Sequence, residues 1–198
     1  RGNGRPVNEE ATIDQLKVIG SIPCELDGRY LRNGANPVSG TSGHPFLGDG
    51  MIHAVRLREG KAEWYRNRYV QTPFVKDTSL DNLDPALMMN MEASKANTHV
   101  VGHAGKILAL EEGHFPYMLD GDLNTLGATD FDGALKGSFT AHPKICPVTG
   151  EMLAFGYSLF EPYLRYLRVS AKGVLAQTEE ITVGGPTMMG CPITGSSF

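Results

Sequence analysis

Apolar and polar residues alternate in several short runs along this chain, which is the pattern of β-strands that bury one face. The clearest pair of runs covers residues 51–57 and 62–70, with the turn residues Glu59 and Gly60 between them. Two alternating runs joined by a tight turn predict a β-hairpin.

The same pattern predicts further strands towards the C-terminus. They are expected over residues 98–101, 106–110, 117–119, 139–146, 152–157, 163–169 and 174–182. Turn residues separate neighbouring runs, as Ala104 and Gly105 do after the first of them. Roughly nine to eleven short strands at a spacing of ~8–12 residues predict an all-β fold.

The N-terminal half is less regular. Residues 12–16 predict a short helical turn, and residues 29–32 predict a strand that ends at the Asn-Gly turn pair directly after it. Residues 35–50 are rich in Gly, Pro and Ser and predict a loop. Residues 76–96 fit either a long connection or a short helix.

Composition agrees with many tight turns and excludes some function classes. The 198 residues include 24 Gly and 12 Pro without a fixed period, which excludes collagen and disfavours long helices. The net charge of −4 comes from mixed charges with no run of Lys or Arg, so no nucleic-acid partner is expected. No apolar run approaches the ~18–20 residues of a membrane span, so we expect no transmembrane segment.

The grouping of the strands is indicated by a short recurring pattern. A glycine followed by Lys106 or by Val174 lies between successive runs, as in up-and-down sheets. At about 40–45 residues per four-stranded blade, the 198 residues hold four or five β-propeller blades at most. We expect one domain over residues 1–198, and a β-sandwich of this length is the competing fold.

Ordinary motifs locate no site. The chain has no GxSxG, P-loop or GxGxxG pattern, and its histidines form no HxH or HExxH pair. The six histidines are His44, His53, His99, His103, His114 and His142. A single histidine on a strand usually has a structural role. His142 is distinctive because Pro143 biases it towards an extended conformation, which would direct its ring as a metal site requires; the spacing alone favours a histidine that caps a hairpin.

Four segments, taken in their order along the chain, favour a functional role for His142 over a hairpin cap. They are GRYLRNGANP at 28–37, FLGDGMIH at 46–53, LALEE at 108–112 followed by Pro116 and Tyr117, and TAHPK at 140–144 followed by PVTGE at 147–151. Together they resemble the N-terminal part of the carotenoid cleavage oxygenase family, and the resemblance runs in order from about Val18 to Met189.

This resemblance implies a fold and a reaction. The family fold is a seven-bladed β-propeller, of which about four blades or fewer would be present here. Four histidines from different inner strands hold a non-haem Fe(II), and three glutamates orient three of their rings. The reaction is the cleavage by O₂ of a C=C double bond in an apolar polyene, which gives aldehyde or ketone products.

The resemblance also assigns individual residues. His142 matches the first iron ligand, and Glu112 matches the first orienting glutamate; the plain alternative for Glu112 is an exposed charge at a strand end. The segment 46–53 matches a structural signature whose glycines would permit positive φ angles, and His53 within it is not a ligand.

The chain departs from the family pattern near its C-terminus. The family places His-Asp after a Thr-Met-Met triplet, whereas Gly190 and Cys191 follow Met189 here. Cys191 is a poor substitute ligand because a thiolate would change the charge and softness of the site. The third and fourth ligands would come after Phe198, so we expect an inactive fragment, and its open sheet edges favour a chain that does not fold alone.

The resemblance gives the substrate only as a class. The branch that cleaves lignin-derived stilbenes has a lysine before the orienting glutamate, whereas this chain has Glu111, which favours a carotenoid or apocarotenoid. Such enzymes take their substrate from membranes through an apolar patch, to which residues 73–91 would contribute, although Met clusters are usually core. Three widely spaced cysteines without a CxxC pair fit a reducing compartment, so we expect a cytoplasmic protein. The resemblance adds peripheral contact with a membrane. The alternatives are a lignostilbene-type dioxygenase and a metal-free polyene-binding protein derived from a propeller.

Overall fold

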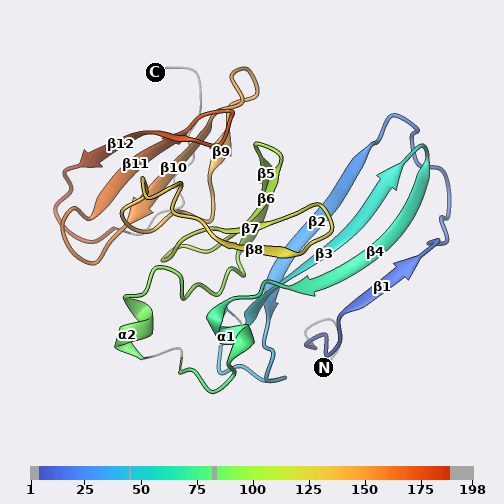
Figure 1. Ribbon diagram of the computed structural model, residues 1–198, viewed down its shortest axis with the longest axis horizontal. Coiled ribbons are helices and arrows are strands. Elements are labelled where there is room, and N and C mark those ends of the chain that lie inside the picture. The colour runs from blue at the N-terminus through green and yellow to red at the C-terminus, as the bar shows by residue number, and fades with distance from the viewer. Residues whose placement is uncertain (1–4, 45, 82–83, 188–198) are drawn as a thin grey trace.

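The computed structural model describes residues 5–44, 46–81 and 84–187, and within them the chain forms three four-stranded antiparallel sheets (Figure 1). The prediction of an all-β fold is confirmed. The described helices are two single turns, α1 (Pro73–Lys76) and α2 (Pro85–Met88), which lie on the connection between the first and middle sheets. Both a long connection and short helices are therefore present there.

The first sheet has the strand order β1-β4-β3-β2. Its strands are β1 (Ala11–Asp14), β2 (Gly28–Asn36), β3 (Asp49–Arg58) and β4 (Lys61–Tyr69). The β3–β4 hairpin confirms the clearest sequence prediction.

Two predictions in the first sheet were wrong. The segment expected as a helical turn contains strand β1, which pairs antiparallel with β4. The Asn67 and Arg68 side chains of β4 also bond the Ala11 amide and carbonyl at 2.7 and 2.9 Å. The Asn33-Gly34 pair is not a turn, because β2 continues through it and Asn33 faces Ile52 of β3. The Asn33 side chain instead donates to the carbonyl of Ala96, 2.8 Å away, and so ties β2 to the next sheet.

The middle sheet has the order β5-β6-β7-β8, and the third sheet has the order β12-β11-β10-β9. The middle strands are β5 (His99–His103), β6 (Lys106–Leu110), β7 (Tyr117–Leu119) and β8 (Thr125–Ala128). The third sheet contains β9 (Lys144–Ile145), β10 (Met152–Tyr157), β11 (Leu164–Val169) and β12 (Leu175–Ile181). Each sheet therefore follows the chain strand by strand apart from β1, as expected for up-and-down sheets.

One predicted strand was too long. Residues 139–146 form a strand only over Lys144–Ile145. Pro143 has no amide hydrogen for the ladder, and the Thr140 hydroxyl accepts the His142 amide at 3.1 Å, which bends the chain before β9. His142 consequently lies just ahead of the strand and not within it.

Strand β6 joins two hydrophobic clusters. Ile107 and Ala109 face the cluster shared with the first sheet, while Leu108 and Leu110 face the cluster shared with the third sheet. A strand buried on both faces has a continuous apolar sequence, as this strand has. The middle sheet thus packs on both of its neighbours, which differs from the two layers of a sandwich.

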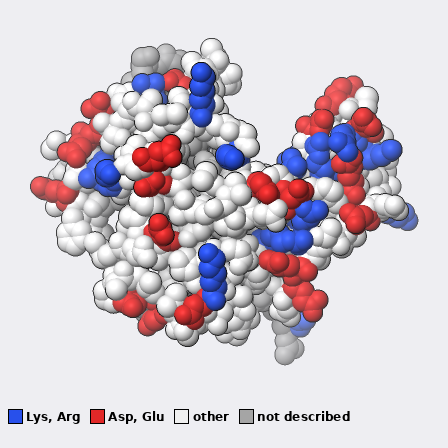
Figure 2. Space-filling view, viewed as in Figure 1, with Lys and Arg blue, Asp and Glu red and all other residues white. Residues whose placement is uncertain are grey.

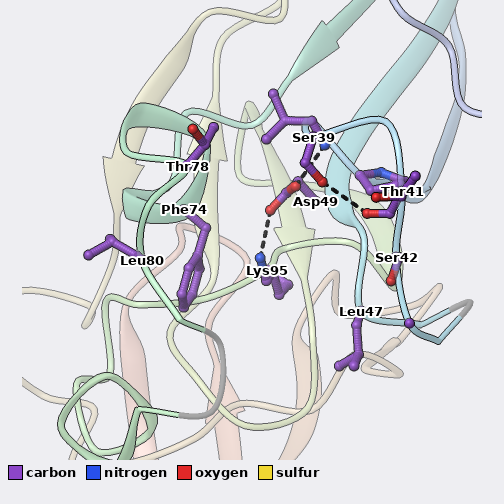
Figure 3. A pocket seen from close by; sticks show the side chains of 12 residues that line it. Ser39, Thr41, Ser42, Leu47, Asp49, Phe74, Thr78, Leu80 and Lys95 are labelled. Atoms are coloured by element: carbon purple, nitrogen blue, oxygen red, sulfur yellow. Dashed lines mark hydrogen bonds and ion pairs between the residues drawn. The ribbon is translucent and has the colours of Figure 1, made fainter.

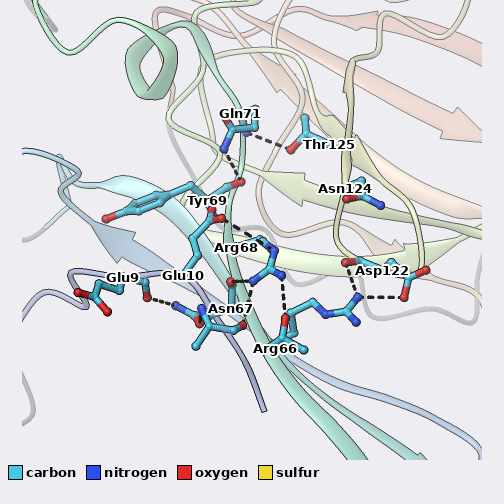
Figure 4. A network of polar contacts seen from close by, with 12 residues as sticks. Glu9, Glu10, Arg66, Asn67, Arg68, Tyr69, Gln71, Asp122, Asn124 and Thr125 are labelled. Atoms are coloured by element: carbon cyan, nitrogen blue, oxygen red, sulfur yellow. Dashed lines mark hydrogen bonds and ion pairs between the residues drawn. The ribbon is translucent and has the colours of Figure 1, made fainter. Parts of the chain in front are cut away.

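Polar side chains of β4 hold the outer parts of the first sheet (Figure 4). The Asn67 amide donates to the Glu9 carbonyl at 2.9 Å. On the other side, Arg66 donates to both the carbonyl and the carboxylate of Asp122, each at 3.0 Å, in the turn between β7 and β8. Side chains of β4 therefore connect the N-terminal segment with the middle sheet.

Charged groups of both signs are interspersed on the face shown in Figure 2, without a continuous basic patch. None of the helices in the described part of the chain is both long and apolar enough to span a membrane.

Gly50 is required for close packing and not for backbone freedom. Neither Gly48 nor Gly50 has a positive φ angle, so the expectation for the segment 46–53 was wrong. A Cβ atom on Gly50 would lie 2.2 Å from the carbonyl oxygen of Ala96, and one on Gly48 would lie 2.8 Å from the Asn36 nitrogen. Two pieces of backbone approach each other here too closely for any side chain.

Replacing Gly50 by alanine tests this packing. We expect Gly50→Ala to lower the free energy of unfolding by about 1–3 kcal/mol or more, because backbone must move to admit the methyl group. The matched control is Gly34→Ala in β2, where a Cβ atom meets nothing within 4 Å and the change should stay within about 0.5 kcal/mol. Equal losses in urea unfolding of the two variants would contradict the explanation.

Candidate metal centre

The structure brings Glu112 and His142 together from neighbouring sheets. Glu112 follows the end of β6, and His142 precedes β9. The Nε2 atom of His142 lies 3.2 Å from Oε1 of Glu112, with side-chain exposures of 50% and 26%. The two residues that the sequence singled out are therefore in direct contact at a partly open position.

Thr140 holds both partners, and the sequence analysis did not identify it. Its buried hydroxyl donates to the second carboxylate oxygen of Glu112 at 3.1 Å and accepts the backbone amide of His142 at 3.1 Å. A hydroxyl has one hydrogen to donate and lone pairs to accept, so it can serve both contacts. The sequence Thr140-Ala141-His142 could have indicated this hydrogen bond, because a threonine hydroxyl often accepts the backbone amide two residues further on.

This arrangement can orient an imidazole for a metal. Metal-bound histidines usually give their other ring nitrogen to a carboxylate, which fixes the ring and its tautomer. The contact with Glu112 uses Nε2 and leaves Nδ1 for a metal while Glu112 stays in place. A metal at Nε2 would have to take the position of the Glu112 oxygen.

A second imidazole lies beside His142. The ring of His99, the first residue of β5, has its centroid 6.2 Å from that of His142, with 34° between the planes. Partial burial lowers the pKa of His99, and positive charge on His142 and on Lys144 lowers it further. These surroundings favour the neutral imidazole of His99, whose lone pair is able to bond a metal.

The donors present suit iron but form only part of a coordination sphere. Imidazole is a good ligand for Fe(II), and a nearby carboxylate offsets its charge. Within the described ranges no group of three or more His, Cys, Asp or Glu side chains could hold a metal ion. The described residues thus fit one corner of a metal site. Cys191 lies outside them.

Other residues named by the sequence have separate partners. The Glu111 carboxylate bonds the Nδ1 atom of His114 and the amide of Gly113. His53 bonds the Tyr65 hydroxyl through Nδ1 at 2.8 Å, on the first sheet. Neither side chain is engaged with His142 in these contacts.

Two cavities among the described residues lie away from this pair. One of about 190 Å³ is bounded by the loop before β3 and by α1 (Figure 3). Inside it the Lys95 ammonium pairs with Asp49 at 2.7 Å, both side chains being at least 86% buried, and lies 3.9 Å from the centre of the Phe74 ring. Another, of about 320 Å³, lies beside β8. Neither is lined by His142 or Glu112, and the ion pair serves to anchor the loop.

The chain is similar to known proteins along most of its length. Residues 4–190 match the family model described as retinal pigment epithelial membrane protein. A carotenoid cleavage oxygenase of Mycobacterium tuberculosis is 44% identical over 191 residues, which are 93% of this chain and 38% of the relative. The carotenoid 9,10(9',10')-cleavage dioxygenase 1 of Arabidopsis thaliana is 41% identical over 223 residues, covering 95% of this chain and 41% of the relative. This chain thus spans about two fifths of these relatives.

Solved structures agree in fold. The crystal structure of Pseudomonas brassicacearum lignostilbene dioxygenase aligns with a TM-score of 0.81 and 32% identity, over 92% of this chain and 42% of that protein. A variant of Synechocystis apocarotenoid oxygenase aligns with a TM-score of 0.74 and 24% identity, over 93% and 45%. The second likeness concerns the fold alone.

The pKa of His99 can be tested by NMR. We expect its ring to titrate below the ordinary value of about 6.5, because burial and two positive neighbours disfavour the charged form. Lys144→Gln removes one of those charges and should raise the pKa of His99. His53 is the control, since burial and Arg32 lower its pKa and Lys144 does not contribute. A His99 pKa at or above 6.5 would contradict the described surroundings.

Proposed function

This chain belongs to the retinal pigment epithelial membrane protein family of carotenoid oxygenases, and on that premise we propose that it is part of an Fe(II)-dependent dioxygenase that cleaves a C=C bond of a carotenoid or apocarotenoid. The products are two aldehyde or ketone fragments. The observation that carries this proposal is the match of 93–95% of the chain to relatives named as carotenoid cleavage enzymes.

His142 is the proposed first iron ligand in this chain. Glu112 orients its ring through Nε2, and Thr140 fixes the carboxylate by donating to its other oxygen. Fe(II), when bound, supplies the redox centre that allows O₂ to react with the polyene. The protein residues contribute a rigidly held donor and a negative charge close to it.

The three sheets are proposed as consecutive blades of a seven-bladed propeller. Each sheet has four antiparallel strands, and the middle sheet packs on both neighbours. Because the described residues supply one corner of the site, we expect the 198 residues alone to cleave no polyene. Residues 1–198 are then the N-terminal part of the propeller domain.

The proposed substrate is a long apolar polyene. The curated relatives are named for carotenoids, and Glu111 occupies the position where the stilbene-cleaving pattern has lysine. Its carboxylate is engaged with His114. The likeness to lignostilbene dioxygenase, at 32% identity, keeps a hydroxylated stilbene as the second candidate substrate.

We also propose a cytoplasmic protein with peripheral membrane contact. Within residues 73–91, Met88 and Met89 at the end of α2 are 52% and 65% exposed and are available for such contact. Phe74 in the same stretch is buried, so part of this apolar cluster is core.

Iron content tests the proposed site in the protein expressed from the full reading frame that contains this chain. We expect about one iron per chain, with His142→Ala losing it and Glu112→Gln weakening iron affinity by about 10–100-fold. His44→Ala, on an exposed loop, and Glu111→Gln are the matched controls and should keep the metal. A protein that binds a polyene but takes up no iron would establish the metal-free alternative.

Substrate class can be tested with the same protein. Chromatography of products should show cleavage of an apocarotenal and no cleavage of a hydroxylated stilbene, and His142→Ala should remove the activity. Cleavage of the stilbene and not of the apocarotenal would instead identify the protein as a lignostilbene-type dioxygenase.

A further inference from the structure

The first sheet carries an apolar row on its far face, which is the face turned away from the middle sheet. Ala54 of β3 faces the cluster shared with the middle sheet, so its neighbour Val55 points to the far face. Directly paired residues share a face, and the register places three more side chains beside Val55: Tyr30, Tyr65 and Ile13. None of the four belongs to either hydrophobic cluster, and Tyr30 and Ile13 are 69% and 50% exposed.

The far face of the third sheet, also turned away from the middle sheet, is similar. Ala154 of β10 lies in the cluster shared with the middle sheet, so its neighbour Phe155 points to the far face. Phe155 pairs with Tyr166 of β11, and their rings pack edge to face with centroids 6.2 Å apart. Leu164 and Ile181 form the next apolar pair on this face. All four side chains are partly exposed and lie outside both clusters.

This fold buries such surfaces by packing one sheet on the next. The first sheet packs on one face of the middle sheet, and the third sheet packs on its other face (Figure 1). Each sheet along the chain thus has one face for a preceding sheet and one face for a following sheet. The two far faces are the unused halves of this contact, so one chain carries both surfaces that a further sheet-to-sheet contact needs.

We propose that two copies of this chain associate head to tail. The far face of the third sheet of one copy packs on the far face of the first sheet of the other copy. Such a contact joins two different surfaces, so it repeats until a ring closes or no space is left. In the seven-bladed arrangement proposed above, on which this stoichiometry rests, two copies of three sheets fill six positions. The remaining position is too narrow for three more sheets, and association therefore stops at two copies.

Sedimentation velocity of the 198-residue chain over a range of concentrations tests this contact. Tyr30→Lys puts an unpaired charge on the far face of the first sheet, and Tyr166→Lys puts one on the far face of the third sheet. Val148→Lys is the matched control, because Val148 is 90% exposed and lies outside the strands. Circular dichroism verifies folding, and Ile181→Lys, at a position that is 36% exposed, replaces Tyr166→Lys if that variant fails to fold.

The original chain and Val148→Lys should sediment with twice the mass of one chain. Tyr30→Lys and Tyr166→Lys should each weaken the dimer by on the order of tenfold or more, because the contact would bury an unpaired ammonium group. An equimolar mixture of these two variants should restore the dimer. One variant then supplies an intact third-sheet face and the other an intact first-sheet face.

Several results would overturn the inference. A folded chain that stays monomeric at every concentration would do so and would leave the proposed function intact. A dimer that only one of the two variants weakens, or that mixing does not restore, would show that the far faces do not meet head to tail. Heterogeneous aggregates would also contradict the inference. Defined assemblies of three or more copies would contradict it together with the seven-bladed arrangement.

Discussion

Burial of β6 on both faces is the constraint from which the rest of the structure follows. Its alternate residues face two hydrophobic clusters, so the middle sheet must pack between the other two. That packing places the residue two positions after the strand, Glu112, against the segment that enters the third sheet. The contact between Glu112 and His142 is thus a consequence of how the sheets pack. Thr140 holds both residues in place through its hydroxyl group.

Close backbone approach fixes the first sheet against the middle one. Gly50 accepts the Val70 amide and donates its own to the Lys95 carbonyl, each at 2.8 Å, and leaves no room for a side chain beside Ala96. Asn33 crosses the same boundary to the carbonyls of Ala96 and His99. The backbone at the start of β5 is therefore positioned by polar contacts from β2.

Much of the fold could be predicted from the sequence, because alternating runs around Gly turns report hairpins directly. The pairs β3–β4, β5–β6 and β11–β12 were found in this way. Strand β1 was missed because its partner strand β4 is far away in sequence. The extension of β2 was missed because Asn-Gly is a common turn pair, whereas here the Asn33 side chain bonds the Ala96 carbonyl as well as the Gly34 amide while β2 continues along β3. Local sequence patterns do not show which residues distant in sequence will pair with a segment.

The candidate site was only partly visible in the sequence. His142 and Glu112 were identified through family motifs, and their contact could not be inferred from a separation of thirty residues. Thr140 and His99 were missed, since a hydroxyl or a lone histidine has many ordinary roles; only the packed sheets give them neighbours.

The most direct measurement is anomalous scattering at the iron edge from crystals of the protein expressed from the full reading frame and loaded with Fe(II). An orienting contact between Glu112 and a metal-bound His142 predicts an iron peak within about 2.0–2.2 Å of a His142 ring nitrogen, with Glu112 beside that residue. An iron peak remote from His142, with its ring turned into solvent, would contradict the proposed centre.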